Sequence, residues 1–144
     1  QWTEPNALGE HIWSSDAHSG AKSLSLRLQA GSTGSRMWAQ TFRTSLSEPT
    51  SRLTPGNTYS LSVFAKTVQG QAMLSVNFYD ASSKWLDAVW KDNVRASNWT
   101  SFSLSVAIPM NAAWFSISAC LLPSGIDAGQ PFAQCWFDDF DLPT

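Results

Sequence analysis

The chain has 144 residues, which is the usual size of one domain and enough to bury a single core. Charged residues make up 14% of it and the formal net charge is −2, so no basic patch is available for nucleic acid or an anionic membrane surface. Its apolar stretches fall well short of the ~20 residues that span a bilayer. We therefore expect a single domain over 1–144, with neither nucleic acid nor a membrane as partner.

Apolar and polar residues alternate over several short segments, which is the pattern of β-strands with one buried face. In chain order these segments are 24–28, 59–65, 74–78, 102–108, 115–121 and 137–142. Turn-forming residues separate them, as at 31–34 and 55–57. No window keeps an apolar stripe at helical spacing. The sequence therefore predicts an all-β fold, a two-sheet antiparallel β-sandwich of the jelly-roll kind.

Short polar residues, nearly all of them serines, occupy the positions opposite the apolar ones in these segments. This composition predicts a flat, wettable sheet face on which a few aromatic residues would form a docking surface. The positions are Ser23, Ser25, Ser60, Ser62, Ser75, Asn77, Ser103, Ser105, Ser116 and Ser118.

Two cysteines, Cys120 and Cys135, flank the turn-forming stretches 123–125 and 129–131. A hairpin would bring them into one neighbourhood, so we predict a disulfide, with two buried free thiols as the alternative. A disulfide favours a secreted, extracellular protein. No export signal precedes Gln1, and we expect any such signal to have been removed.

Eight tryptophans are more than a core of leucine and valine requires, so some are expected on the surface. Exposed rings stack on the C–H bonds of pyranose sugars. If one ring covers ~50 Å² of sugar, its burial contributes about 1 kcal/mol, so useful affinity needs several rings and polar contacts. This favours an oligosaccharide or polysaccharide as the ligand. For any single tryptophan, packing in the core or at its rim is the alternative.

Parity along the strands selects the candidate rings. Trp114 is out of phase with its apolar neighbours, and Trp38 shares a face with Gln40, so either can face outward. Trp85 and Trp90 lie in the segment 84–92, which mixes rings and charges directly after an apparent turn. We expect this segment to bind the ligand.

Residues for catalysis are sparse. His11 and His18 are the only histidines, and no metalloprotease pattern, Gly-x-Ser-x-Gly turn or phosphate-binding glycine loop occurs. Carboxylates for a small glycosidase or lyase are present by residue type, which keeps an enzyme as a less favoured alternative. Asp138 and Asp139 close an apolar strand, where they need a partner such as a hard cation unless both are solvated.

Five segments, taken in order, resemble the carbohydrate-binding modules of the family 4, 9, 16 and 22 group over about 13–142: AHSGAKSL (17–24), WAQ (38–40), PGNTYSLS (55–62), NWTSF (98–102) and WFDDFDL (136–142). The resemblance implies a jelly roll joined to a secreted polysaccharide-degrading enzyme. It also implies a structural calcium ion and a cleft for an internal stretch of plant or algal glycan.

Carried over by position, the resemblance makes Asp138 a calcium ligand, with backbone oxygens near Ser19 and Lys22 and with Asp139 as the alternate. Such modules usually begin with a strand whose glutamate also binds calcium, and nothing before Trp2 supplies it. We therefore expect either that the first strand is missing or that Glu4 or Glu10 replaces that ligand.

Sugar contacts vary within this group, so they are assigned from residue type and parity. We predict Trp85 and Trp90 as stacking platforms, Trp38, Gln40 and Arg43 across the face, and Asn77 and Tyr79 on a neighbouring strand. The predicted function is non-catalytic glycan binding that targets a tethered catalytic domain to its substrate. A structural spacer of the same fold is the alternative.

Overall fold

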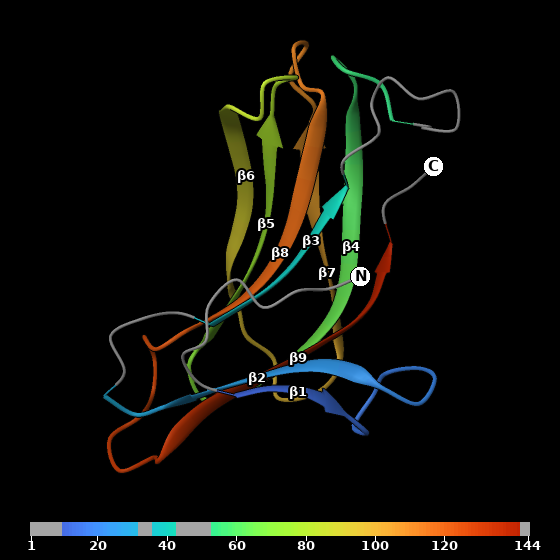
Figure 1. The fold of residues 1–144 in the computed structure, drawn as a ribbon. Helices are drawn as coiled ribbons and strands as arrows, with labels where there is room; N and C mark the ends of the chain where they lie inside the picture. The colour runs from blue at the N-terminus through green and yellow to red at the C-terminus, as the bar shows by residue number, and fades with distance from the viewer. Residues whose placement is uncertain (1–9, 32–35, 43–52, 142–144) are drawn as a thin grey trace.

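The computed structural model describes residues 10–31, 36–42 and 53–141. For residues 10, 11, 36–42, 92 and 93 it describes the backbone only. This part of the chain contains nine β-strands and no helix (Figure 1). The strands are β1 (Glu10–Ser14), β2 (Ser23–Gln29), β3 (Arg36–Phe42), β4 (Thr58–Val68), β5 (Gln71–Tyr79), β6 (Trp85–Val94), β7 (Thr100–Ala107), β8 (Trp114–Leu122) and β9 (Phe132–Asp141).

The strands form two antiparallel sheets, which confirms the predicted all-β sandwich. The five-stranded sheet has the order β1-β2-β9-β4-β7, and the four-stranded sheet has the order β3-β8-β5-β6. Figure 1 shows β1, β2 and β9 crossing the lower end of β5, β6 and β8. Six strands match the alternating segments of the sequence, whereas β1, β3 and β6 were not identified by that alternation.

The core lies between the sheets and is built from alternate residues of their strands. Leu26, Leu61 and Phe137 of the five-stranded sheet and Val76 and Phe78 of the four-stranded sheet are each at most 1% exposed. Because side chains alternate along a strand, the residues between these core positions lie on the outer faces of the two sheets. No helix in the described ranges is long and apolar enough to cross a membrane.

The two cysteines are separate buried thiols, so the predicted disulfide is wrong for this structure. Cys120 lies in β8 opposite Met73, while Cys135 lies in β9 opposite Leu26, on the other sheet. Burial raises the pKa of the Cys120 thiol to about 12 and raises that of Cys135 as well. Both therefore stay protonated and unreactive at neutral pH, and they carry no argument for an oxidising compartment.

The predicted wettable serine face is only partly correct. Ser60, Ser103 and Ser105, on β4 and β7, are exposed. The serines of the more central strands are buried: Ser23, Ser25, Ser75, Ser116 and Ser118.

Candidate functional site

Trp85 and Trp90 of β6 share one face of the four-stranded sheet. They are an odd number of residues apart, so a regular strand would point them to opposite faces. The pairing of β6 with β5 is irregular between Phe78 and Tyr79, and it sets Trp90 opposite Ser75 and Trp85 opposite Tyr79. Both positions of β5 face away from the core. A bulge of this kind therefore brings the two rings to the outer face.

Both rings are available to a ligand. Trp85 is 54% exposed and Trp90 is 60% exposed, among the largest values for apolar side chains in the described chain. Two other residues of β6, Leu86 and Val89, pack against the core and hold the strand on the sandwich. The large apolar side chains of this strand thus serve two purposes: two pack against the core and two are exposed to solvent.

Neighbouring strands add oriented polar and aromatic groups to the same face. The rings of Tyr79 and Trp114 stack with centroids 3.9 Å apart and an interplanar angle of 10°. The indole Nε1 of Trp85 donates a hydrogen bond to Oδ1 of Asn77 at 3.3 Å. This bond leaves the amide nitrogen of Asn77, with two donor hydrogens, for another partner.

Small side chains lie between the rings on β5 and β8. Ser75 is directly opposite Ser118, and Asn77 is directly opposite Ser116. On the β6 side, Ala88 is opposite Asn77. The outer face of the four-stranded sheet is therefore a strip of small, uncharged residues bordered by aromatic rings.

The predicted residues of β3 do not line up with this strip in the backbone register. Trp38 pairs with Ala119 and Gln40 pairs with Ile117, two residues of β8 that belong to the core. Their own side chains are outside what the structure describes, and Arg43 lies outside the described residues altogether. The roles given to these three residues remain predictions.

On the five-stranded sheet, Asp138 is bound by backbone amides of the loop 15–22. Its Oδ2 accepts hydrogen bonds from the amides of His18, at 2.9 Å, and Ser19, at 3.1 Å. Its Oδ1 accepts a hydrogen bond from the amide of Asp139 at 2.9 Å. The carboxylate thus ties the end of β9 to a loop more than a hundred residues earlier in the chain.

Asp139 binds side chains of the same loop. Its Oδ1 accepts a hydrogen bond from Oγ of Ser19 at 2.5 Å, and its Oδ2 lies 2.6 Å from Nδ1 of His18. The Ser19 hydroxyl and then His18 lower the pKa of Asp139. Its backbone is left-handed, with φ 50°, where the pairing of β4 and β9 is irregular. That irregularity lets two consecutive carboxylates reach one loop.

These contacts do not fit a calcium ion between Asp138 and the loop. All four carboxylate oxygens of Asp138 and Asp139 face donors, and amide N–H groups repel a cation. Lys22 is exposed, and the backbone of Glu10 stands opposite Arg27, at the end of β1 that lies away from this loop. No group of three or more metal-binding side chains occurs among the described residues. The calcium prediction itself stays untested.

Removal of calcium with a chelator tests whether this loop and Asp138 bind a calcium ion. If amides and hydroxyls close the loop, the melting temperature should be the same in millimolar calcium and in EDTA, whereas Asp138→Ala should lower it under both conditions. Differential scanning calorimetry of the two proteins provides the measurement. A calcium-dependent rise of several degrees that Asp138→Ala abolishes would restore the calcium site.

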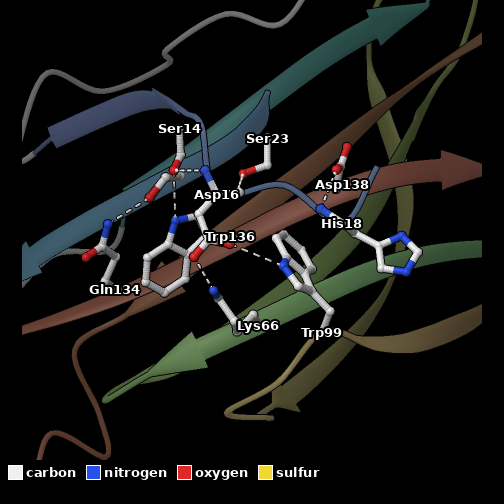
Figure 2. A network of polar contacts seen from close by, with 10 residues as sticks. Ser14, Asp16, His18, Ser23, Lys66, Trp99, Gln134, Trp136 and Asp138 are labelled. Carbon is white, nitrogen blue, oxygen red and sulfur yellow. Dashed lines mark hydrogen bonds and ion pairs between the residues drawn. The ribbon is translucent and has the colours of Figure 1, made fainter. Parts of the chain in front are cut away.

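Lys66 of β4 holds the beginning of the same loop (Figure 2). Its ammonium group pairs with Asp16 and lies 4.5 Å from the ring centroid of Trp136 and 5.4 Å from that of Trp99. Asp16 also accepts a hydrogen bond from Nε1 of Trp99, and its carbonyl accepts one from Oγ of Ser23. Sequence reasoning missed Lys66, because a lysine at an outward position of a strand gives no sign of a partner 50 residues away.

Comparison with solved structures places this fold among known β-sandwiches. No protein-family model and no curated protein matches the chain. A family 22 carbohydrate-binding module from Clostridium thermocellum Xyn10B superposes with a TM-score of 0.62 at 21% identity, over 99% of this chain and 85% of that one. A structure described as family 16 carbohydrate-binding module 2 gives 0.62 at 15% identity, over 99% and 90%. The fold is therefore the β-sandwich of carbohydrate-binding modules, which confirms the resemblance at the level of fold.

A larger protein contains a similar sandwich. The enzymatically active domain of tailspike protein 4 from bacteriophage CBA120 superposes with a TM-score of 0.73 at 14% identity, over 98% of this chain. The chain spans only 19% of that structure and 25% of a Clostridium thermocellum xylanase structure that it also matches. The similarity to those two proteins therefore concerns the fold of one of their parts.

Proposed function

We propose that this chain is a non-catalytic carbohydrate-binding domain whose ligand lies on the outer face of the four-stranded sheet. The observation that carries the proposal is the irregularity in β6, which displays Trp85 and Trp90 on one face beside Asn77. Large apolar side chains that are exposed together usually mark a surface that binds a ligand.

The chemistry of this face suits a sugar chain. Indole rings offer flat apolar surfaces to the C–H faces of pyranose rings, and the Asn77 amide can bond their hydroxyls. Because one ring contributes about 1 kcal/mol by area, two exposed rings and the polar strip between them act together. This arrangement favours an oligosaccharide or polysaccharide over a single sugar.

In the full-length protein, the domain would bind an internal stretch of plant or algal polysaccharide and hold a secreted catalytic domain at its substrate. Such tethering raises the local substrate concentration without any new contact at the catalytic site. Two structural neighbours support the ligand class: one is a module–xylanase structure complexed with xylohexaose, and the other is TmCBM61 complexed with β-1,4-galactotriose.

A polysaccharide panel tests the proposal. We expect affinity gels containing soluble β-glucan, xylan, mannan or alginate to retard the chain in at least one case, with a shift in tryptophan fluorescence for the same glycan. Titration calorimetry should then give a dissociation constant in the millimolar to micromolar range. Unchanged mobility and fluorescence across the panel would leave the structural spacer as the better explanation.

A further inference from the structure

The strip between the aromatic rings contains three buried serine hydroxyls. Ser75 is 8% exposed, Ser116 is 7% exposed and Ser118 is 4% exposed. All three are on the outer face of β5 and β8, since the residues that alternate with them belong to the core. Within the described part of the chain, none of these hydroxyls has a hydrogen-bond partner.

Buried hydroxyls without partners are unusual in native proteins, because each loses its hydrogen bonds to bulk water. The other buried hydroxyls among the described residues show the ordinary arrangement. Ser23 donates to the carbonyl of Asp16, Thr67 donates to the carbonyl of Val94, and Ser25 accepts from the Gln134 amide. Among the residues that the structure describes, the buried hydroxyls without a partner are therefore the three in the strip beside the exposed tryptophans.

Their placement suits a ligand that carries hydroxyl groups. Ser75 and Ser118 are directly opposite each other on adjacent strands, and side chains in that relation have Cβ atoms about 5 Å apart. One sugar hydroxyl can donate to one serine and accept from the other, because a hydroxyl is both donor and acceptor. Ser116, opposite Asn77, offers a second such position beside the amide.

We infer that Ser75, Ser116 and Ser118 are ligand-binding residues that pair with the hydroxyls of the bound glycan while Trp85 and Trp90 cover its rings. The inference rests on the proposed function and adds the polar half of the site. It also accounts for the small size of these residues, since a larger side chain would keep the sugar away from the strip. The glycan thus lies across β8 and β5 toward the exposed rings of β6.

Single substitutions to alanine test this inference. Removing a hydroxyl that has no partner in the described part of the chain should leave the melting temperature unchanged or slightly raised. The same change should weaken binding to the panel glycan that the unaltered chain binds best by about fivefold, the value of one hydrogen bond. Ser105→Ala is the matched control, because Ser105 is an exposed serine on β7 of the other sheet. Titration calorimetry and thermal unfolding provide the two measurements.

The possible outcomes separate the two proposals. If Trp90→Ala weakens binding and all three serine variants bind as tightly as the unaltered chain, the hydroxyls hold only water, and this inference alone fails. A lower melting temperature with unchanged affinity would make the serines structural and would also overturn it. If the unaltered chain binds no glycan, the proposed function fails and the inference fails with it.

Discussion

Replacing Trp90 with alanine is expected to weaken polysaccharide binding by about tenfold to thirtyfold, which corresponds to roughly 1.4–2 kcal/mol. The ring is 60% exposed beside a strip of small residues, so its loss removes contact with the ligand and leaves the core intact. Trp85→Ala should have a similar effect, because it removes a ring and also frees the Asn77 amide that Nε1 of Trp85 now orients. Titration calorimetry with the best glycan of the panel measures both.

A matched control is available on the other sheet. Trp13 of β1 is 55% exposed, so Trp13→Ala removes a ring of the same size and comparable exposure away from the proposed site. We expect this variant to keep the affinity of the unaltered chain. Equal losses in the Trp13 and Trp90 variants would show that binding is not localised on the four-stranded sheet, and the proposed site would then be wrong.

The part of the fold that could be predicted from sequence is the part set by strict alternation. Strands β4, β5, β7 and β8 repeat apolar residues at every second position, so their core faces are evident from the sequence. The strand β6 was not recognised, because its irregular pairing sends Leu86 and Val89 inward and Trp85 and Trp90 outward. A bulge breaks the alternation that identifies a strand.

Contacts between distant segments account for the rest of what could not be predicted. The segment WFDDFDL suggested a calcium site, whereas in the structure its carboxylates accept hydrogen bonds from an early loop, an arrangement that includes a left-handed Asp139. The disulfide prediction failed because spacing around turns does not tell which sheet a strand joins. The orientation of Tyr79 and Trp114 away from the core follows from parity alone, whereas their stacking requires the register between β5 and β8.

A large loss of stability is expected when Asp16 is replaced, because this residue joins the loop 15–22 to the five-stranded sheet. Asp16→Ala should lower the free energy of unfolding by about 1–2 kcal/mol, since it leaves the Lys66 ammonium between Trp99 and Trp136 without its counter-charge. Lys66→Met should be destabilising as well. Because the two residues interact directly, the double variant should cost less than the sum of the single variants by about 0.5–1 kcal/mol. Urea unfolding of the four proteins measures this coupling, and strictly additive losses would show that the pair contributes nothing.

The lowered pKa values of Asp16 and Asp139 predict how stability depends on pH. The hydrogen bond from Lys66 lowers the pKa of Asp16 below its ordinary value of 3.8, and the Ser19 hydroxyl together with His18 lowers that of Asp139. A carboxyl group whose pKa is lower in the folded chain binds protons more weakly there than in the unfolded chain. Its stabilising contribution is therefore complete above its unfolded pKa, near 3.8, and is lost as the pH falls through the lower folded value. The melting temperature should drop below about pH 4, and Asp16→Asn should drop less steeply, because that variant has no carboxylate at this position to protonate.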